Sequence, residues 1–191
     1  MRAQWIPIIA MAALAACSTP PAEKPAAAVV AVPAQVGTLM QAEAALAPAS
    51  ASIVSGRLVL VSQPGGIRIT GTLGGLRPQQ QAAFHIHERG DCSAVDASSA
   101  GAHFNPMGSA HGRDGQAPHH LGDMDNLQAD AAGRVAVDTY LSGVVLGGAA
   151  INDVLGRAFI VHSQADDYRS QPAGNAGARV ACGVIRPTSP T

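Results

Sequence analysis

The chain has 191 residues, of which 47% are hydrophobic, 13% are charged and 3% are aromatic, and its formal net charge is −1. This length suits one domain with appendages, and the near-neutral charge without lysine and arginine clusters argues against a nucleic-acid-binding protein. The 21 glycines and 13 prolines favour many turns over a helical bundle. All seven histidines fall between His85 and His162, which predicts a turn-rich domain with a histidine cluster inside it.

Residues 1–16 are predicted to be an export signal. A positive start at Arg2 precedes an apolar run of about a dozen residues, short of the roughly 20 that a membrane-spanning helix needs. The segment Leu14-Ala15-Ala16-Cys17 resembles the lipobox of bacterial lipoproteins. This resemblance implies cleavage before Cys17, lipidation of Cys17 and, through Ser18, sorting to the outer membrane. The alternative is ordinary signal cleavage nearby, with Cys17 discarded or inert.

Residues 17–49 are predicted to form a tether between the anchor and the folded part. Alanine and proline dominate this segment, and an apolar face is suggested only at residues 39–46. Chains of this composition are typically extended or disordered. We therefore expect the globular domain to occupy residues 50–191, with a poorly defined first strand near residues 50–54.

Short segments in which apolar and polar residues alternate follow from about residue 50 onward. Such segments lie at residues 57–61, 67–73, 84–87, 134–138 and 158–162. This period-2 pattern, divided by glycine-rich turns, predicts an all-β fold arranged as an antiparallel sandwich or barrel. Residues 88–126 show no strand pattern but carry four of the seven histidines. A loop that long inside a compact domain is typical of a binding site or a metal site.

Three histidines lie on predicted strands. His85 and His87 are two residues apart, so both rings leave one face of their strand while Phe84 and Ile86 leave the other. His162 lies on a similar strand. Three such imidazoles, looking outward from a core behind them, can converge on one metal, and an all-histidine set suits copper. The alternative is that the pair forms ordinary surface histidines.

A second set of candidate ligands lies in or just beyond the long loop, and it comprises His103, His111, His120 and Asp123. Three imidazoles and one carboxylate suit tetrahedral Zn²⁺. His119 is a spare histidine and, being adjacent to His120, is the alternative ligand.

Three cysteines are an odd number that an exported protein must explain. If Cys17 carries lipid, Cys92 and Cys182 remain as a pair that an oxidising compartment allows to form a disulfide. The alternative is two free buried thiols.

Several segments closely resemble the copper/zinc superoxide dismutases, in the order and near the spacing of that family. They are Phe84-His85-Ile86-His87-Glu88, Gly101-Ala102-His103-Phe104-Asn105-Pro106, His120-Leu121-Gly122-Asp123, Val161-His162 and residues 174–185. The resemblance runs from about residue 57 to residue 187. It implies a Greek-key β-sandwich or barrel of immunoglobulin-like architecture with long metal-binding loops, of which these enzymes are a known example.

The resemblance also implies a role for each candidate residue. The implied copper ligands are His85, His87, His103 and His162, and the implied zinc ligands are His103, His111, His120 and Asp123. His103 then bridges both metals. Asp166 is implied to hydrogen-bond one histidine of each site, Arg179 to dock an anion beside the copper, and Cys92 to form the intrasubunit disulfide with Cys182.

The implied function is the dismutation of superoxide to oxygen and hydrogen peroxide, with His103 and Arg179 as catalytic residues. The protein would act in the periplasm or cell envelope, held to the membrane through Cys17, as a monomer or a homodimer. The alternative function is a non-catalytic lipoprotein that binds copper and zinc for storage or buffering. Storage requires the ligands but not an anion-docking arginine, so the combination of a bridging His103 with Arg179 and Asp166 favours catalysis.

Overall fold

The alternating segments form β-strands in the computed structural model, which describes residues 37–188. The strands are β1 (Gln41–Pro48), β2 (Ser55–Gln63), β3 (Gly66–Gly74), β4 (Gln81–Ala82), β5 (Phe84–His87), β6 (Leu127–Gln128), β7 (Val135–Ser142), β8 (Ala158–His162), β9 (Arg179–Val184) and β10 (Arg186–Pro187). Within these residues the single helical element is the 3₁₀ turn η1 (Ser98–Ala100), and no helix is long and apolar enough to cross a membrane. The all-β fold class is therefore confirmed.

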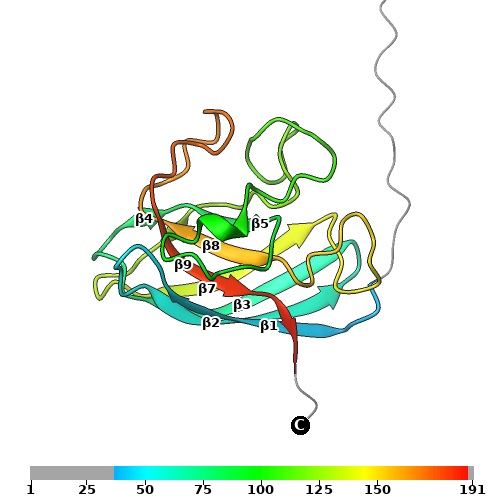
Figure 1. Cartoon of the computed structure of the whole chain (residues 1–191), viewed down its shortest axis with the longest axis horizontal. Helices are drawn as coiled ribbons and strands as arrows, with labels where there is room; N and C mark the ends of the chain where they lie inside the picture. Colours follow the sequence, from blue (N-terminus) through cyan, green and yellow to red (C-terminus); the bar gives the residue numbers. More distant parts are fainter. Residues whose placement is uncertain (1–36, 189–191) are drawn as a thin grey trace, which may run out of the picture. The chain divides into compact units, whose positions relative to one another are not determined.

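Two antiparallel layers share strand β1 (Figure 1). Most of β1 pairs with β2, and β2, β3 and β7 follow in order, whereas its last residues Ala47 and Pro48 pair with β9, which continues to β8 and β5. From β3 in the first layer the chain crosses to β5 in the second, and it returns to β7 beside β3. This crossing is the Greek-key connection that the family resemblance implied.

One hydrophobic core fills the space between the layers. The rings of Phe84 and Phe159, from neighbouring strands of the second layer, stack there with centroids 5.0 Å apart. Leu58, Ile69 and Leu141 face them from the first layer and are fully buried. Each large apolar side chain buried in this way stabilises the fold by about 1.5–3 kcal/mol. The core supports the strands from behind and leaves their outer face for the site.

The predicted domain boundary at residue 50 is wrong. Strand β1 begins at Gln41, and the Leu39 amide donates a hydrogen bond to the Leu146 carbonyl at 3.0 Å, so part of the predicted tether belongs to the sheet. The inward positions of β1 are Ala42, Ala44 and Leu46, all buried. Alanine is a weak apolar signal, and alanines also occupy outward positions of β1, which hides the alternation. Residues 50–54 form a turn and its continuation rather than a strand.

The export signal, Cys17 and the greater part of the predicted tether lie outside the described residues, and their assignments stay predictions. Inside the described part, the other predicted strands lie where the alternation placed them, to within a few residues at their ends. Residues 88–126 contain no strand, as expected, and their short isolated bridges attach them to β5.

Candidate metal centre

The outer face of β5 and β8 carries the strand histidines. Phe84 and Ile86 of β5 point into the core, and His85 and His87 leave the opposite face, as the two-residue spacing predicted. His162 lies at the end of β8 on the same face. The expectation that these rings look outward needs one correction, because all three residues are at most 4% exposed. Loops cover this face, so the histidines lie in a second, polar interior.

Two segments of the long loop, one at Phe104 and one at Gly122, are hydrogen-bonded to the main chain of β5. The Phe104 amide donates to the Ile86 carbonyl at 2.8 Å, and the Ile86 amide donates to the Gly122 carbonyl at 2.9 Å. His87 and His103 form an antiparallel bridge, and so do His85 and Asp123. A side chain at position 122 would collide with the Ile86 carbonyl, which explains the glycine there. Both loop segments thus behave as short extra strands that deliver His103 and Asp123 to the site.

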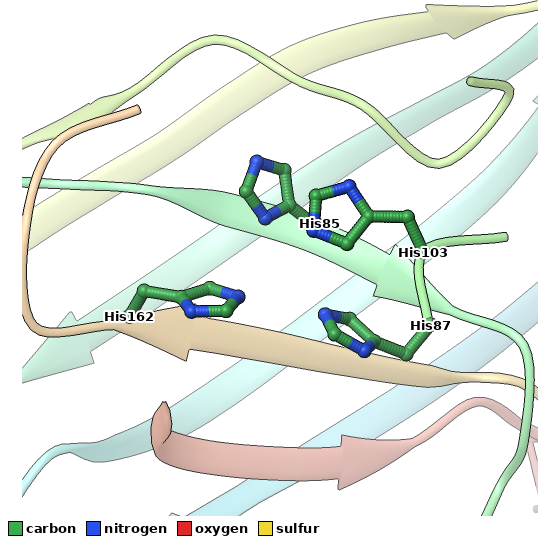
Figure 2. A group of neighbouring side chains, drawn as sticks. All are labelled: His85, His87, His103 and His162. Carbon is green, nitrogen blue, oxygen red and sulfur yellow. The ribbon is translucent and has the colours of Figure 1, made fainter. Parts of the chain in front are cut away.

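Four imidazole rings converge in the first cluster (Figure 2). One nitrogen of each ring lies within 4.8 Å of a nitrogen of each other ring. The ring nitrogens not used by the surrounding protein are His85 Nδ1 and the Nε2 atoms of His87, His103 and His162. All four are buried and have no hydrogen-bond partner. A buried polar atom without a hydrogen-bond partner lowers the stability of the fold by about 1–3 kcal/mol. Four buried nitrogens that face one point therefore require a common partner. A copper ion held by imidazoles supplies one.

The second cluster joins three histidine nitrogens and one carboxylate. His103 Nδ1 and His120 Nδ1 lie 2.8 Å and 3.2 Å from Asp123 Oδ1, and they lie 3.4 Å from each other. His111 Nδ1 faces the other oxygen of that carboxylate, Asp123 Oδ2, at 3.0 Å. A tetrahedral zinc ion with ligands at 2.0–2.1 Å requires ligand-to-ligand edges of about 3.3 Å. The observed separations bracket that edge, so these donor atoms fit Zn²⁺.

Two residues connect the clusters. The ring of His103 turns Nε2 toward the first cluster and Nδ1 toward the second, as expected of a bridging imidazole. The carboxylate of Asp166 accepts from His85 Nε2 at 2.7 Å and from His111 Nε2 at 3.0 Å, and both side chains are fully buried. These two bonds fix which nitrogen of each ring remains for a metal. Asp166 therefore lies in the linking position that the family resemblance implied.

Burial and charge set the protonation of the rings. Burial lowers the pKa of His103 to about 4 against the pull of Asp123, and burial with the neighbouring His85 lowers the pKa of His162 to about 3. His111 is the exception, because Asp123 and Asp166 overcome its burial and raise its pKa to about 9. Hydrogen bonds from the histidines likewise hold the pKa of Asp123 well below its usual range although burial opposes this. Neutral imidazole and ionised carboxylate are the forms that bind metals.

Arg179 lies at the edge of the first cluster. Its two terminal nitrogens donate to the carbonyls of Ala97 and Gly101, each at 2.7 Å, and the Gly101 carbonyl also accepts from His87 Nδ1 at 2.9 Å. Partial burial lowers the pKa of the guanidinium, which remains far above neutrality. The charge of Arg179 is thus fixed beside a copper-ligand candidate. Cys92 and Cys182 form the predicted disulfide, which ties the segment that carries both carbonyls to β9.

Comparison with known proteins identifies this arrangement. The family model described as copper/zinc superoxide dismutase (SODC) matches residues 54–185. The chain belongs to this family. It is 43% identical over 136 residues to superoxide dismutase [Cu-Zn] 2 of Aquifex aeolicus, a match that covers 70% of this chain and 80% of that protein. Copper and zinc are therefore the cofactors that the two clusters accommodate.

Some relatives in the family are named only as superoxide dismutase-like proteins. The chain is 42% identical over 127 residues to the superoxide dismutase-like protein YojM of Bacillus subtilis, with 63% of each chain covered. The crystal structure of a double mutant of a SOD-like protein from Bacillus subtilis resembles this fold with a TM-score of 0.69 and 38% identity. That match covers 75% of this chain and 96% of the other. Membership of the family thus establishes the fold and the metals, and the family includes proteins named only as superoxide dismutase-like.

Several residues that hold the candidate ligands in place are not predicted by the sequence. The side-chain amide of Asn126 donates to the Asp166 carbonyl at 2.9 Å and accepts from the Asp166 amide at 2.8 Å. The side-chain amide of Gln171 makes the same pair of bonds with the main chain of His111. Amide side chains are common in loops, and no periodicity marks these two. His119 is not part of either cluster, because its Nε2 faces Asp114 at 3.7 Å while His120 supplies the ligand atom.

Proposed function

We propose that the protein dismutates superoxide to oxygen and hydrogen peroxide. The observation that carries this proposal is the fixed cation of Arg179 beside four converging, unpartnered imidazole nitrogens. A protein that only stores metal needs the nitrogens but gains nothing from a guanidinium bound to the carbonyl that also orients His87. In this proposal His85, His87, His103 and His162 bind copper, and His103, His111, His120 and Asp123 bind zinc.

Bound copper supplies one-electron oxidation and reduction. The residues of the chain supply the rest. Arg179 uses two of its five N–H groups on the carbonyls of Ala97 and Gly101, which leaves three to hold and orient a small oxygen anion. His103 can hold and release a proton at Nε2 while its Nδ1 stays among the zinc ligands. The zinc ligands and Asp166 keep that ring in place.

The test is superoxide decay catalysed by the disulfide-intact protein loaded with copper and zinc. Arg179→Ala should lower the rate by roughly tenfold or more, since a fixed charge in a cleft raises the capture of an anion by about 10- to 1,000-fold. Copper and zinc contents should stay unchanged. Arg169→Ala, at an exposed arginine for which the structure shows no ion pair, is the control. Tight binding of both metals without superoxide decay would instead assign the protein to metal storage.

We propose further that Cys17 carries the lipid anchor and places the domain in the cell envelope. Support comes from the resemblance of Leu14-Ala15-Ala16-Cys17 to a lipobox and from the disulfide of the domain, since disulfides persist in oxidising compartments. Cys17→Ala should move the protein from the membrane fraction to the soluble fraction, whereas Thr19→Ala should leave it at the membrane. Membrane attachment of the Cys17→Ala variant would refute the anchor.

A further inference from the structure

His111 differs from the other proposed zinc ligands in how its main chain is held. His103 is bridged to β5, Asp123 is bridged to His85, and the His120 amide bonds to the Asp123 carboxylate at 2.9 Å. The described residues give His111 no backbone-to-backbone hydrogen bond. Its main chain is bound by one side chain, that of Gln171, which lies 60 residues further along the chain.

The carboxamide of Gln171 binds both polar groups of that main chain. Gln171 Oε1 accepts from the His111 amide at 2.8 Å, and Gln171 Nε2 donates to the His111 carbonyl at 2.9 Å. Each group therefore has a partner of the right polarity. Gln171 itself is exposed, whereas the His111 side chain is fully buried. The amide thus reaches the zinc cluster from outside and holds one ligand against it.

The loop that carries Gln171 is rigid enough to act in this way. The exposed carboxylate of Asp167 accepts from the amides of Arg169 and Ser170, from the Ser170 hydroxyl at 2.6 Å and from Asn175 Nδ2 at 3.0 Å. These bonds lower the pKa of Asp167 to about 2. The turn from residue 167 to residue 175 is therefore closed around one carboxylate, so Gln171 is presented in a defined position.

A second contact joins the same loop to the same ligand. Gly174, at φ +64°, lies directly over the hydrogen bond between Asp166 and His111, and its amide donates to the Ser170 carbonyl at 2.7 Å. The ring of His111 is thus held by Asp166 at Nε2, and its main chain is held by Gln171. Two independent attachments to one short loop fix the direction in which His111 Nδ1 faces Asp123.

We infer that Gln171 is a positioning residue for zinc, acting through the main chain of His111. It does not touch the metal site itself. Groups that orient a metal ligand typically contribute 10- to 100-fold in metal affinity. Since Gln171 is exposed and water can replace part of its bonding, we expect the lower end of that range. The copper ligands are held by β5 and β8, so copper binding should not depend on Gln171. The inference rests on the proposed assignment of His111 as a zinc ligand.

The test compares zinc and copper in the fully loaded protein. Gln171→Leu removes both hydrogen bonds to His111, together with a longer bond of 3.3 Å to the Arg169 carbonyl. Gln171→Glu keeps the acceptor but sets a carboxylate oxygen against the His111 carbonyl. Both variants should bind zinc roughly tenfold more weakly in competition with a chelator. With cobalt in place of zinc, the visible spectrum of the variants should differ from that of the parent. In the zinc-loaded protein, the copper content and the copper EPR signal should not change. Gln116→Leu, on the same loop as His111 and without a side-chain hydrogen bond in the structure, is the matched control.

Each outcome has one meaning. Selective weakening of zinc in both variants, with the control unchanged, supports the inference. Zinc affinity within about twofold of the parent, or equal loss of copper and zinc, overturns it, because Gln171 would then be dispensable or would support only the fold. A His111→Ala variant that still binds zinc at full affinity would instead overturn the ligand assignment, which separates the two failures.

Discussion

Substitution of Gly174 by alanine tests how much the hydrogen bond between Asp166 and His111 contributes to stability and to zinc binding. A Cβ atom added at this position would lie 1.8 Å from Asp166 Oδ1 and 2.8 Å from His111 Nε2. Neither distance is tolerable, so the alanine must displace the carboxylate, the ring or the loop. Gly174→Ala should therefore break the 3.0 Å hydrogen bond between Asp166 and His111. The substitution changes no ligand and no charge.

The expected cost has two parts. Alanine at a left-handed φ costs roughly 1–2 kcal/mol, and losing a hydrogen bond to a charged group costs about 1.5–3 kcal/mol. Gly108 has the same φ of +64° but has no atom within 4 Å of its added Cβ, so Gly108→Ala shows the backbone cost alone. The free energy of unfolding should therefore fall by about 2.5–5 kcal/mol in Gly174→Ala and by about 1–2 kcal/mol in Gly108→Ala.

The assay is urea unfolding of the metal-free, disulfide-intact protein, followed by zinc titration of each variant. Zinc affinity should fall by roughly 10- to 100-fold in Gly174→Ala and stay near the parent value in Gly108→Ala. Equal effects of the two alanines on stability and on zinc would refute the reasoning. They would mean that the loop absorbs the methyl group without moving Asp166.

Three further predictions concern the core, the disulfide and pH. Phe159→Ala removes a fully buried ring stacked on Phe84 and should cost about 3–5 kcal/mol in urea unfolding, against about 1 kcal/mol or less for Val61→Ala at an exposed strand position. Replacing both Cys92 and Cys182 by serine opens a link between residues 90 apart, so the free energy of unfolding should fall by up to about 4–5 kcal/mol; no change in the urea midpoint would contradict this. Burial lowers the pKa values of His103 and His162 to about 4 and about 3, so below their ordinary value of 6.5 the unfolded chain binds more protons than the folded one. The metal-free protein should therefore lose stability as the pH falls from 6.5 toward 4, and urea midpoints that do not fall over this range would contradict the shifts.

The sequence predicts the strands of the second layer well because their alternation uses strong signals. Phe84 and Ile86, like Phe159 and Val161, are large apolar residues at every second position, and the structure buries all four in the core. Strand β1 fails the same test because its inward side chains are mostly alanines, as are several of the outward ones. Strand β1 pairs with β2 and, through Ala47 and Pro48, with β9, and pairing with a segment as distant as β9 leaves no mark in a single sequence.

The two-residue spacing predicts the face on which His85 and His87 lie, but it carries no information on their burial. A strand pattern reports only which side chains share a face. Whether that face meets water depends on the loops, here residues 103–126 and 163–178, which rise beyond β5 and β8 in Figure 1. Their cover removes water from the imidazoles, and this desolvation lowers the pKa of His162 to about 3.

The candidate ligands can therefore be recognised in the sequence, whereas the residues that hold them cannot. Histidine is rare enough that seven in one stretch, at organised spacings, require an explanation. Asn126, Gln171 and Gly174 are ordinary loop residues whose importance arises only when two loops meet, across 40 residues for Asn126 and Asp166 and across 60 for His111 and Gln171. A metal site built on loops needs such residues because loops lack the ladder of hydrogen bonds that orients a strand. Side-chain amides replace that ladder, since one amide can both donate to and accept from a single main-chain residue.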